Sequence, residues 1–153
     1  MNRDGWECPC GSGALLRACC GRYLACVAQD RVPAAEATVH DAAVAAAVLG
    51  AGAPTAEALM RSRYTAFVLR DAAYLLATWA TSTRPENLST SATTIWKRLL
   101  IQDTVAGGPE EARGEVAFTA AYTDGGGRGR QQERSRFERA DGRWVYVDGD
   151  VLD

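Results

Sequence analysis

The sequence of 153 residues contains a single histidine, His40. It also contains a single lysine, Lys97, because the other 16 of its 17 lysine and arginine residues are arginine. A Ser-His-Asp or Cys-His relay would have to use His40, which lies in an alanine-rich segment where we expect a solvated surface side chain. Long apolar runs are missing too, because residues 42–53 are mostly alanine and glycine and fall short of the ~20 residues that span a bilayer. The N-terminus lacks the apolar segment of a secretory signal, so we expect a cytoplasmic protein without a membrane partner.

The composition is that of one folded domain. Hydrophobic residues make up 47% of the chain, charged residues 24%, and the formal net charge is −2. This balance excludes a largely disordered chain and argues against a protein defined by general affinity for nucleic acid. Three zones follow from the distribution of residue types: a cysteine-containing segment over residues 1–26, an alanine-rich linker or extra helix over residues 27–53, and a folded domain over residues 54–153.

The third zone begins with helical patterns. Thr55 is a suitable N-cap for a helix that follows Pro54, and apolar residues recur there at spacings of three to five. Asp71 can cap a second helix in the segment DAAYLLATWATS.

Strand patterns follow from about residue 95. The apolar residues of EVAFTAAYT alternate with small and polar ones, a loop is expected over residues 124–129, and Asp141-Gly142 is a strong hairpin signal. Trp144, Tyr146 and Asp148 are expected on one face of the last strand. The sequence therefore predicts an α+β fold in which helices cover one face of an antiparallel sheet of about four strands.

Four of the five cysteines form the pattern C-x-C-x8-C-C: Cys8, Cys10, Cys19 and Cys20. Four thiolates so close in sequence suit a tetrahedral zinc ion, and a reducing compartment disfavours disulfides. An iron–sulfur cluster is an alternative, and Cys26 is expected to be a free thiol. A site in which every ligand is a cysteine leaves no position for a substrate water, so the zinc would be structural. Arg3, Arg17 and Arg22 are close enough in sequence to offset its negative charge.

Longer segments resemble known proteins. CPCGSGALLRACCGRY is similar to the SEC-C metal motif at the tail of the SecA preprotein translocase ATPase. Together with PTAEALMRSRYTAFVLRDAAYLLATW and ERSRFERADGRWVYVDG, it resembles the YchJ-like family of uncharacterised bacterial proteins. The resemblance implies a zinc knuckle with Cys8, Cys10, Cys19 and Cys20 as ligands, followed by a cone-shaped domain like nuclear transport factor 2. Residues 34–53 look like an insertion.

A cone of this kind can enclose a pocket, so side chains near its interior are candidates for a site. Each has a structural alternative, because Asp71 can be an N-cap, Arg63 and Arg136 can form ion pairs with Asp71 or Glu133, and the aromatic residues can be core. The candidates are Arg63, Tyr64, Asp71, Tyr74, Trp79, Arg136 and Trp144.

Two hypotheses of function follow, with a third behind them. The first is a noncatalytic adaptor whose zinc knuckle docks a protein partner, as translocase tails do. The alternative is an enzyme of isomerase or dehydratase type, or a binder, with a small ligand in the cone. RNA binding through the arginines of residues 128–143 is the third, for which a solvated face is the expected alternative.

Overall fold

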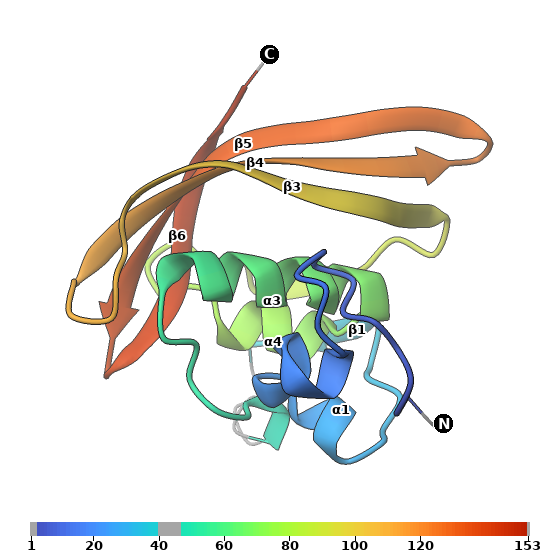
Figure 1. Ribbon diagram of the computed structural model, residues 1–153, viewed down its shortest axis with the longest axis horizontal. Helices are drawn as coiled ribbons and strands as arrows, with labels where there is room; N and C mark the ends of the chain where they lie inside the picture. The colour runs from blue at the N-terminus through green and yellow to red at the C-terminus, as the bar shows by residue number, and fades with distance from the viewer. Residues whose placement is uncertain (1–2, 40–46, 153) are drawn as a thin grey trace.

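The computed structural model describes residues 3–39 and 47–152. An arched antiparallel sheet of four strands, in the order β3-β4-β5-β6, lies over two helices, and the N-terminal segment packs on the far side of those helices (Figure 1). The predicted α+β architecture with a curved sheet is confirmed. The face of the sheet that is turned toward the helices is called the inner face below, and the opposite one the outer face.

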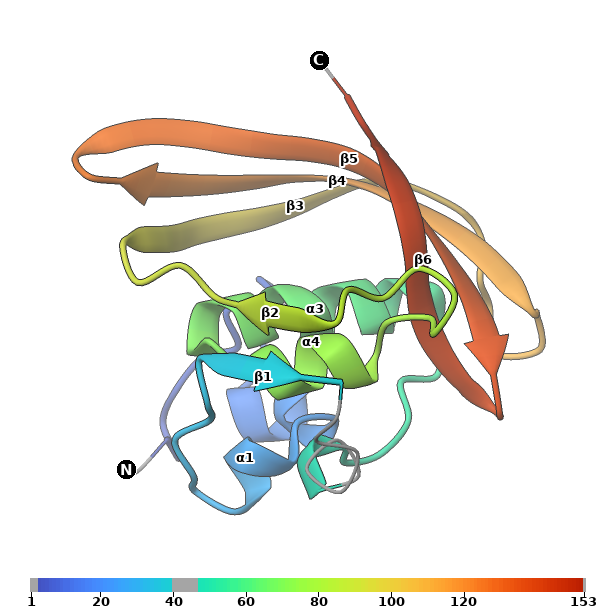
Figure 2. The same cartoon turned by 180° about the vertical axis from the view of Figure 1, so that it is seen from behind.

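Short elements make up the N-terminal segment. Two 3-10 helices, η1 (Leu16–Ala18) and η2 (Cys20–Arg22), precede the short helix α1 (Ala25–Ala28). Strand β1 (Glu36–Thr38) then pairs antiparallel with β2 (Asn87–Ser89), on the side seen in Figure 2. The sequence analysis did not predict this small second sheet, because three-residue strands carry too little periodicity. His40 and most of the predicted alanine-rich helix lie outside the described residues.

Both predicted helices begin at the expected caps. Helix α3 (Ala56–Leu69) starts where the Ala58 amide donates to the Thr55 hydroxyl at 3.0 Å. Helix α4 (Ala72–Ala77) starts where the Tyr74 amide donates to the Asp71 carboxylate at 3.1 Å. A side-chain acceptor satisfies an amide that has no partner within its helix, so these caps fix where each helix begins.

The four strands form a meander of long hairpins: β3 (Thr94–Ala106), β4 (Arg113–Asp124), β5 (Gly127–Ala140) and β6 (Arg143–Val151). Asp141 and Gly142 both have positive φ, as the predicted two-residue hairpin turn requires. The loop predicted over residues 124–129 is instead a two-residue turn at Gly125-Gly126, and β5 begins directly after it. Positive φ at both of these glycines makes the tight turn possible.

The prediction of which residues share a face of the last strand is wrong for Asp148. Phe137 is opposite Tyr146, whereas the neighbouring Arg136 is opposite Asp148, so Val147 is an extra residue on β6. A bulge of this kind shifts the alternation of side chains by one position. Trp144 and Tyr146 share one face, the inner one, but Asp148, which was expected beside them, lies on the outer face, where it pairs with Arg136.

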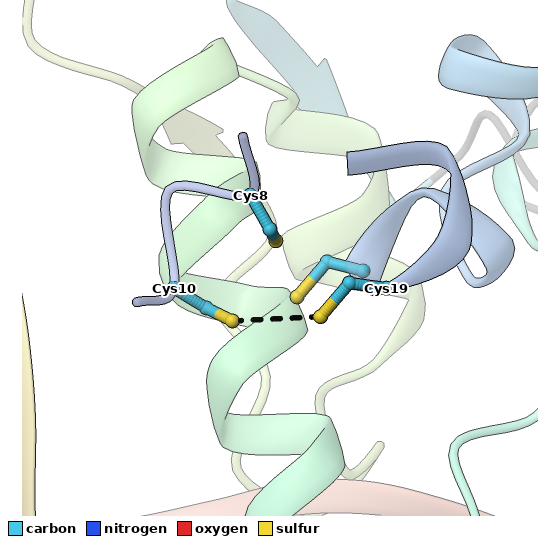
Figure 3. Close-up of side chains that lie close together, drawn as sticks. Cys8, Cys10 and Cys19 are labelled. Atoms are coloured by element: carbon cyan, nitrogen blue, oxygen red, sulfur yellow. Dashed lines mark hydrogen bonds between the residues drawn. The ribbon is translucent and has the colours of Figure 1, made fainter. Parts of the chain in front are cut away.

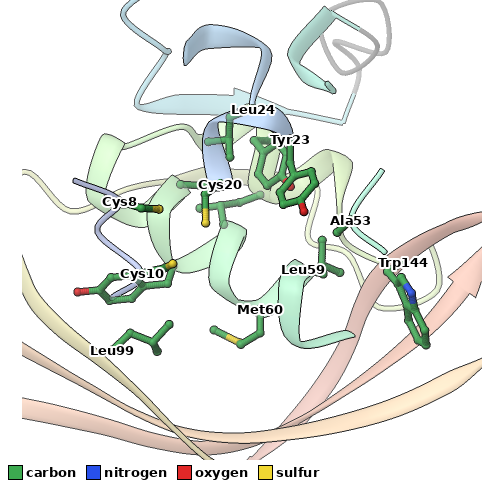
Figure 4. Close-up of a cluster of buried hydrophobic side chains, with 14 of the residues drawn as sticks. Cys8, Cys10, Cys20, Tyr23, Leu24, Ala53, Leu59, Met60, Leu99 and Trp144 are labelled. Atoms are coloured by element: carbon green, nitrogen blue, oxygen red, sulfur yellow. The ribbon is translucent and has the colours of Figure 1, made fainter. Parts of the chain in front are cut away.

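The hydrophobic core joins the N-terminal segment to the sheet. One cluster contains Cys8, Cys10 and Cys20 of the N-terminal segment, Leu59 and Met60 of α3, and Leu99 of β3 (Figure 4). A short segment gains stability when it buries apolar surface against a neighbour. No helix among the described residues is long and apolar enough to cross a membrane.

Candidate metal centre

Cys8 and Cys10 belong to a tight turn near the N-terminus. The Cys8 amide donates to the Ala14 carbonyl at 2.9 Å, and the Gly11 amide donates to the Cys8 carbonyl at 3.2 Å. Gly11 has a φ of +83°, which side chains with a Cβ rarely adopt. The turn therefore directs both thiols of the C-x-C pair to the same side.

Cys19 and Cys20 occupy the junction between η1 and η2. The Cys19 amide donates to the Leu16 carbonyl at 3.1 Å and closes η1, and Cys20 opens η2. Leu16 is fully buried and anchors this junction to the core. The change of direction at Cys19 lets two consecutive cysteines present their sulfurs to one point, which a continuous helix would not allow.

The four sulfur atoms form one compact group. All of them lie within 4.8 Å of one another, and the Sγ atoms of Cys10 and Cys19 are 3.6 Å apart (Figure 3). A tetrahedron with metal–sulfur bonds of 2.3 Å has sulfur–sulfur edges of about 3.8 Å. The cysteines are free thiols, and their spacing fits a tetrahedral metal ion.

Burial makes it costly for these four thiols to ionise without a bound cation. Cys10 and Cys20 are almost completely buried, while Cys19 is partly exposed. Hydrogen bonds with Cys20 and Cys8 lower the pKa of the Cys10 thiol, whereas the bonds with Cys10 and Cys8, together with burial, raise the pKa of Cys20. The sulfurs compete for the same protons, and a bound cation would let all four ionise.

Helix α3 supplies contacts that the sequence analysis missed. The Arg61 guanidinium donates to the Cys10 carbonyl at 2.8 Å, and the Thr65 hydroxyl lies 3.8 Å from the Cys8 sulfur. Arg61 and Thr65 are one helical turn apart, so one face of α3 supports the C-x-C turn. Their spacing in LMRSRYTAF was the available signal, but nothing in the sequence related it to the distant cysteines.

The arginines expected near the metal have different roles. Arg22 donates to the Cys19 carbonyl at 2.9 Å, so it borders the centre. Arg17 forms ion pairs with Asp4 and Asp30, and the buried Arg3 donates to the carbonyls of Cys26 and Arg31.

Among the candidate pocket residues, Arg63 and Trp79 are neighbours. The fully buried Arg63 donates 2.7 Å hydrogen bonds to the Leu75 carbonyl and the Thr78 hydroxyl. Its guanidinium lies 5.3 Å from the centre of the Trp79 ring and 4.8 Å from that of Tyr146. Burial lowers the pKa of Arg63 to about 10.

Four further candidates, Tyr64, Asp71, Tyr74 and Trp144, are buried but dispersed through the core. Asp71 caps α4 and accepts from the Cys26 thiol at 3.4 Å, while Tyr74 exchanges a 2.8 Å hydrogen bond with Ser62. Tyr64 packs edge-on against Trp96, and Trp144 donates to the Pro54 carbonyl at 3.3 Å. The recess that Tyr74 and Trp144 share has a volume of about 20 Å³.

Arg136 lies on the outer face and does not join the rest. It pairs with Asp148 at 2.6 Å and with Asp150 at 2.7 Å. These partners differ from the predicted Asp71 and Glu133. Beside it, an open groove of about 410 Å³ is lined by residues of both signs, among them Arg113, Glu115 and Glu138.

Comparisons with known proteins agree with the fold and the cysteine motif. The family described as "YchJ, middle NTF2-like domain" matches residues 55–149. A UPF0225 protein of Streptomyces coelicolor is 44% identical over 95% of this chain and 96% of its own length. This chain belongs to the YchJ-like UPF0225 family. A second UPF0225 relative, from Xanthomonas oryzae pv. oryzae, is 46% identical over 92% of each chain.

Solved structures place this UPF0225 chain beside SEC-C motif proteins. The solution structure of a SEC-C motif containing protein from Rhodopseudomonas palustris is similar, with 28% identity, a TM-score of 0.67, and coverage of 97% of this chain and 100% of that one. A SEC-C motif containing protein from Psychrobacter arcticus shares the fold, with 23% identity, a TM-score of 0.65, and coverage of 100% of this chain and 86% of that one. The UPF0225 chain therefore combines a SEC-C motif, whose four cysteines could bind a metal, with an NTF2-like domain.

Proposed function

We propose that this protein is a noncatalytic docking module in which a zinc ion, held by Cys8, Cys10, Cys19 and Cys20, stabilises a knuckle that binds a protein partner. The observation that carries the proposal is the group of four thiols within 4.8 Å of one another. An all-cysteine set of four suits zinc and leaves it no open position for a substrate. Its role would then be to shape a surface.

Two exposed apolar side chains beside the knuckle form the proposed docking surface. Trp6 is 43% exposed and Leu15 is 48% exposed. Their backbones lie side by side, because Glu7 bridges to Leu15 and the Leu16 amide donates to the Trp6 carbonyl at 2.8 Å. Tryptophan is enriched among the residues that dominate protein–protein binding energy. A metal that rigidifies the knuckle would hold this pair in place and lower the entropy lost on binding.

The packing around Arg63 favours a docking role over a catalytic one. The two rings beside its guanidinium and its hydrogen bonds to Leu75 and Thr78 satisfy it within the fold. A buried arginine with these partners is a structural element of the core.

The zinc part of the proposal is tested on protein purified without chelators. Elemental analysis should find one zinc ion per chain, and X-ray absorption should find four sulfur neighbours at about 2.3 Å. An oxygen or nitrogen neighbour would mean an open or different site, and protein purified without stoichiometric metal would also refute this part.

The docking part is tested by quantitative partner capture from a lysate of the species that encodes the chain. We expect Trp6→Ala/Leu15→Ala to abolish capture of a defined partner while zinc content stays unchanged. Ile95→Ala/Val105→Ala is the matched control, because it removes equally exposed apolar side chains from the outer face of the sheet. Equal capture by all three proteins would refute the docking surface without affecting the zinc assignment.

A further inference from the structure

The hairpin between β4 and β5 projects past the end of β6. In the described part of the chain, one edge of β5 is therefore open there, on the side away from β4. Among the described residues, β5 pairs with β6 only from Glu133 onward, and the last contact is the Leu152 amide donating to the Gln132 carbonyl at 2.8 Å. Among the residues that the structure describes, residues 127–131 pair with β4 alone. Figure 1 and Figure 2 show this end of the hairpin standing clear of β6.

The direction of the backbone groups along this free edge follows from the hairpin register. Gly127 closes the two-residue turn opposite Asp124, so Gly127 and Gly129 direct their amides and carbonyls toward β4. Arg128 and Arg130 therefore direct theirs toward the open edge, with the same parity as the Gln132 carbonyl that accepts from Leu152. An open row of such groups is a template for another strand.

Basic side chains extend from this edge across the outer face of β5, β4 and β3. Two adjoining open grooves on the outer face, of about 620 and 480 Å³, are lined by Lys97, Arg98, Arg128 and Arg130 and contain no acidic residue. Within the described part of the chain, no carboxylate lies within 4.0 Å of these four side chains. At the other end of β5, Arg134 and Arg136 are paired with four acidic residues on the same face: Asp103, Glu115, Asp148 and Asp150.

We propose that residues 127–131 of β5 bind an acidic peptide as an added antiparallel strand. Residues of the peptide opposite Arg128 and Arg130 would place their side chains on the outer face, where carboxylates meet the two guanidinium groups. The residue between them would face inward at Gly129, against which the Tyr122 ring packs closely. The expected ligand therefore alternates acidic and apolar residues.

Two observations favour a peptide over other occupants. Strand addition of a second copy through the same edge would bring Arg128 and Arg130 of the two copies together, and like charges repel. Single-stranded RNA binding uses exposed aromatic platforms, but the aromatic side chains at this end, Tyr122 and Trp96, pack against each other with ring centres 5.3 Å apart. This surface is separate from the proposed knuckle surface, so either proposal can fail alone.

Binding is tested with a fluorescent synthetic peptide of alternating Glu and Val, measured by fluorescence polarisation. We expect Arg128→Gln/Arg130→Gln to weaken binding by about tenfold or more, and Arg134→Gln/Arg136→Gln to change it by less than about twofold. Both variants remove two charges from the same face of the same strand, so the second is a matched control. Equal weakening by both pairs would mean unspecific attraction and would overturn the proposal.

Backbone pairing is tested by hydrogen exchange. The peptide should slow exchange of the Arg128 and Arg130 amides and leave the Gly129 amide unchanged, because Gly129 already pairs with β4. A peptide with N-methyl groups along its pairing edge should not bind. Binding of the N-methylated peptide, equal binding of a Lys-Val peptide, or tighter binding of oligouridylate RNA at Arg128 and Arg130 would each overturn the proposal.

Discussion

Arg63 and Arg130 carry the same charge on opposite sides of one sheet, in contrasting surroundings. Arg63 is buried between two aromatic rings and donates hydrogen bonds within the fold, whereas Arg130 lines an open groove that has no carboxylate among its described lining residues. The buried thiols of the knuckle lie on the same side of the sheet as Arg63, beyond the two helices. A buried polar group must be satisfied by its neighbours, whereas an exposed one need not be. The inner residues are therefore constrained by folding, and the outer ones at the hairpin end are available for binding.

The largest effect is expected at the metal centre. Cys20→Ser, or removal of metal by a chelator, should lower the free energy of unfolding by about 4 kcal/mol and the melting temperature by roughly 8–16 °C. The reason is that the knuckle loses one of its four ligands or the ion itself. Cys26→Ser is the control, since Cys26 is equally buried but contacts Asp71 rather than the sulfur group. Calorimetry and elemental analysis check the result. If both variants keep their metal and have the same melting temperature, the four thiols do not stabilise the N-terminal segment through a bound metal.

The next effect separates the two sides directly. Arg63→Ala should destabilise the fold by about 3 kcal/mol, because it removes buried hydrogen bonds and ring packing, whereas Arg136→Ala should leave stability almost unchanged. Arg136 forms two ion pairs, but it is exposed. Urea unfolding of both variants measures the difference. Similar values for the two arginines would break the contrast between the faces.

Two glycines extend the comparison to the ends of the hairpin. A Cβ at Gly114 would lie 2.5 Å from the backbone of Gly107, which cannot move aside, so Gly114→Ala should cost about 2 kcal/mol. A Cβ at Gly129 would meet only the end of the Tyr122 side chain, which can rotate. We expect Gly129→Ala to cost less than about 1 kcal/mol. A larger effect at Gly129 in thermal melts would show that the hairpin end is as constrained as its base.

The smallest effect concerns pH and the cap of α4. Burial raises the pKa of the Asp71 carboxyl, so its contribution to stability is fully present below its pKa in the unfolded chain and is lost as pH rises through the folded pKa. Asp71→Asn should change stability at pH 7 by less than about 1 kcal/mol, because asparagine caps helices equally well.

The stability difference between wild type and this variant should move in favour of the wild type as the pH falls from 7 toward 4. Comparing the two proteins cancels the effect of acid on the thiols. A constant difference across that range, measured by urea unfolding, would contradict this assignment.

Local patterns were sufficient for most of the fold. The caps at Thr55 and Asp71 and the turn at Asp141-Gly142 depend on neighbouring residues alone, so they could be read directly. The bulge at Val147 could not, because it depends on how β6 pairs with β5. It also placed Asp148 on the opposite face from the predicted one.

The cysteine spacing by itself determined that four sulfurs lie within reach of one metal ion, because a tight turn and two 3-10 turns bring near neighbours together. Only the tertiary structure decided that Arg61 and Thr65 support this centre, that the pocket candidates are dispersed, and that part of β5 pairs on one side only among the described residues. The physical reason is range. A turn or a cap is a contact over a few residues, whereas packing and strand pairing join segments that the sequence keeps far apart.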